Sequence, residues 1–272
     1  MSSRRQSLIF PREHGAWGIL LVPLITGGWI GTLTGGGGLM LAPLTIAVLA
    51  LFWLRTPVES LMGTAPIKAR SAEERKLVLE VIGALTAVSV AALVWLFWRW
   101  RNLELLWIGF IAAVAFLLQT LTRRRWRIVA QIVGAAGLTA VGPSAYYVVT
   151  GKLDDTAGAI WFSNLAFAAN QIQYVQLRIH AAQAATPQQK WSAGRSFMFA
   201  QAILIALLIA GSAGGFLPQY TIVSFAPILY RGFSWFATRF KPLNVHRLGK
   251  TELAYAILFG ILLILTFAAE KV

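Results

Sequence analysis

The sequence contains a succession of apolar runs, each close to the length that crosses a lipid bilayer as a helix. A helix needs about 20 mostly apolar residues to span the hydrocarbon layer. Because lipid satisfies no backbone hydrogen bonds, such runs predict an all-α membrane protein, with residues 1–272 forming a single polytopic transmembrane domain. We place nine spans, at residues 15–33, 39–55, 77–98, 103–121, 127–149, 157–179, 196–212, 216–234 and 251–269.

The composition excludes an ordinary soluble protein. Hydrophobic residues make up 57% of the chain and charged residues 12%, whereas soluble domains carry about 25% charged residues. The net charge of +14 would suit nucleic acid, but the basic residues lie in short segments between apolar runs. We therefore expect membrane lipid, and no nucleic acid, as a partner. The chain has no cysteine, which excludes disulfides and thiolate metal ligands.

The basic residues also predict the orientation of the spans. With a cytoplasmic N-terminus and nine spans, 20 of the 24 basic residues lie on the cytoplasmic side, and the exceptions are Arg99, Arg101, Lys152 and Lys271. Such a bias is the usual determinant of topology. It predicts a multi-pass protein of the cytoplasmic membrane with its C-terminus outside.

Two cytoplasmic segments carry helix-start signals. Ser71 followed by Glu74 has the spacing of a capping box. Thr186 and Gln189 have the same spacing, and Pro187 between them favours the first helical position. We expect these segments to form short surface helices rather than disordered linkers.

The sixth span carries an unusual polar run: Asn164, Asn170, Gln171, Gln173, Tyr174, Gln176, Arg178 and His180. Asn170, Tyr174 and Arg178 are four residues apart, so they share one helix face. Polar side chains at this depth mark a functional site or hydrogen-bond neighbouring helices. As a site, Asn170 and Arg178 would bind substrate, and Tyr174 would act in catalysis as a hydrogen-bond donor.

Two more clusters lie at the cytoplasmic ends of the first two spans. Arg12, Glu13 and His14 enter the first span, and Arg55 and Glu59 end the second. In one interpretation Arg12, His14 and Arg55 bind an anionic headgroup, while Glu13 and Glu59 are acid/base or metal candidates. In the other, Arg12 pairs with Glu13 at the surface and Arg55 pairs with Glu59 along the helix.

A fourth cluster enters the last span, and Arg247 is its substrate-binding candidate. Its members are Lys241, Asn244, His246, Arg247 and Glu252. The three histidines, His14, His180 and His246, all fall on the cytoplasmic side. A histidine-bound metal or haem is a minor hypothesis, because the three are far apart in sequence.

The run from Pro11 to Trp17, followed by Pro23, resembles the start of the YwiC-like family of bacterial membrane proteins. The end of the sixth span, from Tyr174 to Arg178, and the segment from Arg247 to Glu252 are similar to later features of that family. The resemblance implies a bacterial integral membrane protein and no particular reaction.

The architecture more distantly resembles the UbiA-type prenyltransferases, which have nine spans and polar clusters after the second and sixth. In that family, aspartate-rich motifs at those places hold Mg²⁺ against a prenyl diphosphate. Here the corresponding stretches, 55–59 and 170–178, contain no aspartate, and Glu59 is their only carboxylate. The resemblance therefore implies a shared helical bundle and leaves Mg²⁺-dependent transfer in doubt.

These features favour a polar pocket open to the cytoplasm. The leading hypothesis is that the pocket binds or modifies a lipid or prenyl-type substrate with an anionic headgroup. The alternatives are a small transporter for an anion or polar metabolite and a non-catalytic membrane factor. The outer halves of the spans are almost purely apolar, which counts against a polar path across the membrane.

Overall fold

The computed structural model confirms that the chain is all-α. It describes residues 3–10, 14–63, 67–100, 104–122, 127–184, 186–238 and 243–270. Within these ranges the chain forms eleven α-helices and one short 3₁₀-helix. The helices are α1 (Ser3–Ile9), α2 (His14–Leu33), η1 (Gly38–Met40), α3 (Leu41–Met62), α4 (Ala72–Trp100), α5 (Glu104–Thr122), α6 (Arg127–Thr139), α7 (Val141–Thr150), α8 (Asp155–His180), α9 (Pro187–Ala213), α10 (Thr221–Ala237) and α11 (Val245–Ala269).

Six of the described helical segments are long and apolar enough to cross a membrane. They comprise α2, α3 together with η1, α4, α6 together with α7, α9 and α11. Of the other predicted spans, α5 contributes only a shorter apolar helix, α10 has 17 residues, and α8 carries the polar run. The chain is therefore a multi-pass membrane protein, and the count of nine spans and their orientation stay predictions.

The helix α3 continues well past residue 55, where the predicted second span ends. Arg55 and Glu59 end the apolar run, but their side chains pair four residues apart and Pro57 is accommodated within the helix. The helix ends only at Gly63, whose φ of 73° is the left-handed conformation that favours glycine at a helix end. The apolar run of this segment therefore ends before the helix itself ends.

The predicted span 127–149 is two helices, α6 and α7, which meet at Ala140. Pro143 explains the interruption, because proline has no N–H to bond the carbonyl four residues earlier and its ring crowds that carbonyl. That carbonyl belongs to Thr139, the last residue of α6. The side chain of Thr139 bonds back into α6, where its hydroxyl donates to the carbonyl of Ala135 at 2.8 Å.

Both predicted helix starts are confirmed. The Glu74 N–H donates to the Ser71 hydroxyl at 3.1 Å, and the Ser71 N–H donates to the Glu74 carboxylate at 3.4 Å. At α9, Thr186 and Gln189 form the reciprocal bonds of a capping box, with Pro187 in the first turn. The expected short surface helices are instead the first turns of the long helices α4 and α9, which local polar bonds fix before the apolar parts begin.

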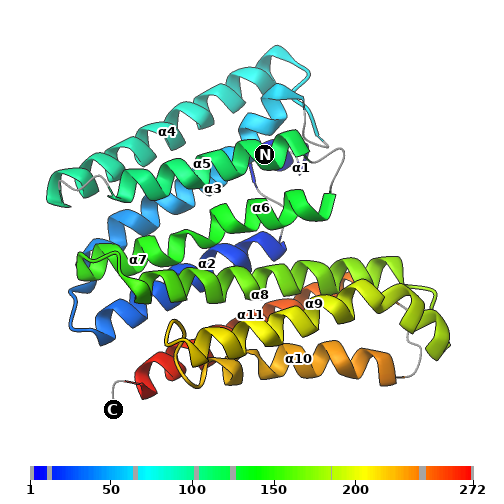
Figure 1. Ribbon diagram of the computed structural model, residues 1–272. Coiled ribbons are helices and arrows are strands. Elements are labelled where there is room, and N and C mark those ends of the chain that lie inside the picture. The colour runs from blue at the N-terminus through cyan, green and yellow to red at the C-terminus, as the bar shows by residue number, and fades with distance from the viewer. Residues whose placement is uncertain are drawn as a thin grey trace. The chain divides into compact units, whose positions relative to one another are not determined.

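The chain divides into two compact units. Unit 1 comprises residues 1–14 and 37–103, and unit 2 comprises residues 15–36 and 104–272. In unit 1, α3 packs along α4, and the short α1 packs on both (Figure 1). Trp53 donates its indole N–H to the carbonyl of Ile9 at 2.8 Å, and Arg4 pairs with Glu74 at 2.8 Å. A single membrane domain over residues 1–272 stays a prediction.

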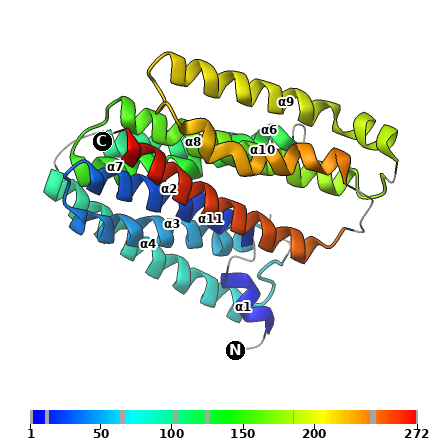
Figure 2. The same cartoon turned by 90° about the horizontal axis from the view of Figure 1, so that it is seen from below.

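Unit 2 contains the remaining helices, and α8, α9, α10 and α11 pack side by side in it (Figures 1 and 2). Its apolar core includes Phe167, Phe225 and Phe259 from α8, α10 and α11. Phe167 and Phe259 stack with ring centroids 4.2 Å apart, and Phe225 meets Phe259 edge-on at 5.1 Å. This stack fixes three of the helices that carry the polar residues described below.

A close helix approach in unit 2 joins α2 to α7. A Cβ atom built on Gly27 would lie 2.0 Å from the carbonyl oxygen of Gly142. The two backbones therefore touch without side chains between them, which is a common way for membrane helices to pack.

We predict that Gly27→Ala destabilises unit 2, because the added methyl overlaps a backbone atom that cannot move independently. Overpacking of this kind costs about 1–3 kcal/mol. The matched control is Gly109→Ala on α5, where a Cβ meets nothing within 4 Å. Thermal unfolding in lipid nanodiscs measures both variants. Equal melting temperatures for the two would contradict the close α2–α7 contact.

Candidate functional site

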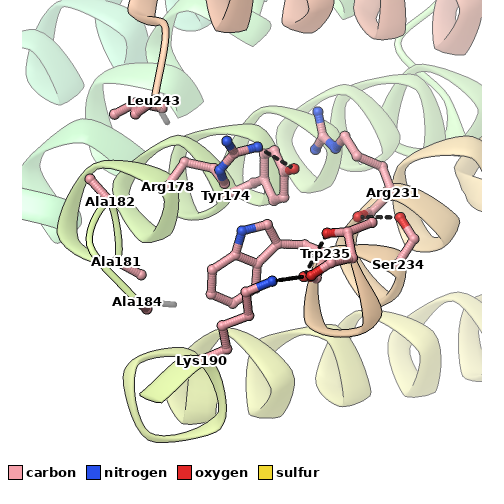
Figure 3. A pocket seen from close by; sticks show the side chains of 11 residues that line it. Tyr174, Arg178, Ala181, Ala182, Ala184, Lys190, Arg231, Ser234, Trp235 and Leu243 are labelled. Carbon is pink, nitrogen blue, oxygen red and sulfur yellow. Dashed lines mark hydrogen bonds between the residues drawn. The ribbon is translucent and has the colours of Figure 1, made fainter. Parts of the chain in front are cut away.

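A pocket of about 210 Å³ lies between the ends of α8, α9 and α10 in unit 2 (Figure 3). Among the described residues, its lining contains three basic side chains and no carboxylate. The lining residues are Tyr174, Arg178, Ala181, Ala182, Ala184, Lys190, Arg231, Ser234, Trp235, Thr238 and Leu243. The local charge therefore favours an anion, and the alanines, Trp235 and Leu243 give the pocket an apolar part.

Tyr174 and Arg178 reach the pocket from α8. Arg178 donates from Nη1 to the Tyr174 hydroxyl at 3.3 Å, and Figure 3 shows its guanidinium beside that ring. Tyr174 is buried, whereas Arg178 is half-buried. The predicted shared face of Asn170, Tyr174 and Arg178 is confirmed, since all three are directed toward the same cluster of polar side chains.

Lys190 crosses from α9 to the end of α10. Its Nζ donates to the carbonyl of Trp235 at 3.2 Å and also to that of Thr238, and it lies 5.4 Å from the centre of the Trp235 ring. The last carbonyls of a helix have no partner within it and carry partial negative charge. Lys190 therefore closes the C-terminus of α10 and holds Trp235 in the pocket wall.

A buried ion pair lies at the inner end of the pocket. Arg231 of α10 donates to the carboxylate of Glu252 on α11, and each side chain is only 6% exposed. The Arg231 guanidinium lies between two aromatic rings, 4.1 Å from the centre of Tyr174 and 4.8 Å from that of Tyr255. Its Nη2 also donates to Asn170 Oδ1 at 3.4 Å. Arg231 thus joins three helices.

Sequence reasoning missed Arg231, which it counted only among the orienting charges. The signal was present, because Arg231 falls inside the predicted span 216–234 and Glu252 inside the span 251–269. Opposite charges near the same ends of two apolar helices predict a pair. Lys190 was likewise counted only as an orienting charge, and its contact with the end of α10 has no local sequence signature.

Other polar residues of α8 bond to neighbouring helices, as the structural interpretation of this run predicts. Asn164 donates to the Thr26 hydroxyl on α2 at 3.2 Å, and Gln176 donates to Gln131 on α6 at 3.1 Å. Gln171 donates to the backbone carbonyl of Glu252 at 2.9 Å. The polar residues of α8 therefore bond to neighbouring helices along much of its length, and at its end they line the polar pocket.

Arg55 and Glu59 lie in unit 1, on α3. The Arg55 Nε donates to the Glu59 carboxylate at 2.9 Å, and the two side chains are 20% and 19% exposed. The expected pairing along the helix is confirmed. A single carboxylate already bound by a guanidinium does not supply the oxygen ligands that Mg²⁺ requires. These residues therefore do not fit the Mg²⁺ site that the prenyltransferase likeness implies.

The remaining candidate residues lie near the start of α2 and the start of α11. Arg12 and Glu13 fall outside the described residues, and for His14 only its place at the start of α2 is described. Arg247 is exposed in the first turn of α11, where its N–H donates to the Asn244 side chain. Their assignment as binding or catalytic residues stays a prediction.

No group of three or more potential metal ligands occurs among the described histidine, aspartate and glutamate residues. His180 at the end of α8 bonds through Nδ1 to the carbonyl of Gln176 at 2.7 Å, and His246 is exposed on α11. The histidine-bound metal or haem hypothesis gains no support from their positions.

Long apolar helices with buried polar groups between them define a multi-pass α-helical membrane protein. The family model described as YwiC-like protein matches residues 10–146. This match covers half of the chain, and the chain belongs to that family. Neither a curated protein nor a solved structure matches the chain, so the prenyltransferase likeness stays a prediction. The family match ends before α8 and does not extend to the pocket.

We predict that Lys190→Met destabilises the protein, because two carbonyls at the end of α10 lose a charged donor. Hydrogen bonds to charged groups are worth about 1.5–3 kcal/mol. Lys250→Met, an exposed position on α11, is the matched control. Thermal unfolding in nanodiscs should show a larger loss for the Lys190 variant. An equal loss in both variants would show that Lys190 does not hold α10.

Proposed function

We propose that this protein binds an anionic, phosphate-type headgroup of a membrane lipid or isoprenoid in the pocket of unit 2. The observation that carries the proposal is the charge of the lining, whose described residues include Arg178, Lys190 and Arg231 and no carboxylate. Guanidinium groups recognise phosphate with two parallel hydrogen bonds. Arg178 and Arg231 are therefore the principal ligands, with the Tyr174 hydroxyl as a further donor.

The size of the pocket supports a headgroup rather than a whole lipid. Pockets for drug-sized ligands usually measure about 300–1,000 Å³, whereas this one measures about 210 Å³. The apolar wall formed by Trp235 and Leu243 would receive the first part of a hydrocarbon chain. The rest of such a chain would remain in the bilayer beside the exposed apolar helix faces.

The proposal extends to the topology and to residues beyond the pocket. The pocket would open to the cytoplasm in a nine-span bundle, as the positive-inside bias favours. Arg12, His14, Arg55 and Arg247 stay proposed ligands for an anionic headgroup. A chemical step, where one occurs, would involve Glu13, Glu59 or Tyr174.

We predict that the purified protein retains phosphatidylglycerol in preference to phosphatidylcholine, and that Arg178→Ala lowers the retained amount roughly tenfold. One lost charged hydrogen bond is worth about 1.5–3 kcal/mol, and 1.4 kcal/mol is a factor of ten. Native mass spectrometry of protein released from nanodiscs that contain both lipids measures the occupancy. Arg195→Ala, an exposed cation on α9, is the matched control for non-specific attraction.

Two further arms sharpen this experiment. Added inorganic sulfate competes for the site only if the tetrahedral anion, rather than the lipid chain, provides most of the affinity. Arg55→Ala tests, by the same occupancy measurement, whether Arg55 also binds an anionic headgroup. Equal phosphatidylglycerol occupancy in wild type, Arg178→Ala and Arg195→Ala would contradict the proposed function.

A further inference from the structure

The ion pair of Arg231 and Glu252 adjoins the pocket, and each of its two side chains is only 6% exposed. Taking two charges out of water is expensive, and their mutual attraction compensates only when the remaining hydrogen-bonding capacity is also used. The hydrogen-bonding capacity of the Arg231–Glu252 pair is not fully used. Within the described part of the chain, Arg231 Nε and Glu252 Oε1 are buried without a hydrogen-bond partner. The pair is therefore retained at a cost in stability, which points to a use beyond packing.

Arg231 faces two ways. It lines the pocket, whereas Glu252 is not among the lining residues and lies behind it on α11. Inside this cluster the guanidinium is the shared partner of the inner carboxylate and of any anion in the pocket. Both anions draw on the single positive charge of Arg231, so each weakens the attraction of that charge for the other. A neutral Glu252 would end this weakening and leave the whole charge of the guanidinium to the ligand.

The surroundings of Glu252 contain few other charges. Arg231 comes from α10, and Tyr174 and Arg178 come from α8. Tyr255 lies one turn further along α11, beside the same guanidinium. The packed part of α2, residues 16–33, has no titratable side chain. Glu252 is therefore the only carboxylate in this described cluster, and its protonation changes the charge that the ligand meets.

We propose that Glu252 is a proton-binding site and that proton uptake by its carboxylate is coupled to anion binding at Arg231. The inference rests on the proposed function, since it concerns the same pocket. The proton comes from water and adds to a carboxylate oxygen, while Arg231 keeps its charge and exchanges a carboxylate partner for the ligand anion. The ion pair at the inner end of the pocket thus stays balanced before and after binding.

A soluble short-chain phosphatidylglycerol is a suitable probe, because its phosphodiester keeps the same charge from roughly pH 5 to 8. Binding to wild-type protein in phosphatidylcholine nanodiscs is measured by calorimetry across this range. If one proton is taken up with each bound probe molecule, the affinity for the probe falls by at most tenfold for each unit by which pH rises. We expect a total fall of about tenfold or more, with close to one proton taken up per ligand at the upper end.

The matched variants are Glu252→Gln and Glu270→Gln, the latter exposed at the end of the same helix. Glu252→Gln should bind the probe with an affinity that no longer depends on pH and without proton uptake. Glu270→Gln should behave as wild type. His180→Gln should also behave as wild type, which excludes the exposed histidine at the end of α8 as the source of the pH dependence.

Proton uptake by wild-type protein is obtained from the binding heat in buffers of different ionisation enthalpy. This measurement needs no variant, so it holds even if Glu252→Gln fails to fold. Probe binding that is independent of pH and releases or takes up no proton would overturn the coupling while leaving the proposed function intact. Absence of probe binding at every pH would overturn the proposed function, and the coupling with it.

Discussion

Unit 2 depends on one physical constraint, the need to balance the charge of Arg231 in an apolar helical bundle. That guanidinium contacts α8 through Asn170 and Tyr174 and α11 through Glu252 and Tyr255. A charge in such surroundings destabilises the fold unless it is paired and hydrogen-bonded. The pair therefore fixes the relative positions of α8, α10 and α11 at one end, as the stack of phenylalanines does farther along.

Most of the helices could be predicted from hydropathy and helix-start signals, because both are local. Every predicted span overlaps a described helix, although α10 begins only at Thr221, and the starts of α4 and α9 lie where the capping residues predict. The errors have local causes as well. The pairing of Arg55 with Glu59 carries α3 beyond its apolar part, and Pro143 divides one predicted span into α6 and α7. The hydropathy pattern indicates which residues are apolar enough for lipid contact, and it does not determine where a helix ends or is interrupted.

The site was only partly predictable, because its essential contacts join residues far apart in sequence. The face of Asn170, Tyr174 and Arg178 follows from helical periodicity alone. The partners of that face do not, since neither the Arg231–Glu252 pair nor the contact of Lys190 with α10 has a fixed spacing. The family model matches residues 10–146, which do not include the residues that line the pocket. The family match therefore identifies no role for those residues.

The central claim is that unit 2 tolerates Arg231 and Glu252 only as a pair, because either one alone would leave an unbalanced buried charge. Thermal unfolding of Arg231→Met, Glu252→Met and the double variant measures their coupling directly. Removal of one partner of a buried pair costs about 3–5 kcal/mol, whereas apolar replacement of both is often close to neutral. The account predicts that the double variant is more stable than either single variant. A double variant whose loss equals the sum of the two single losses would contradict it.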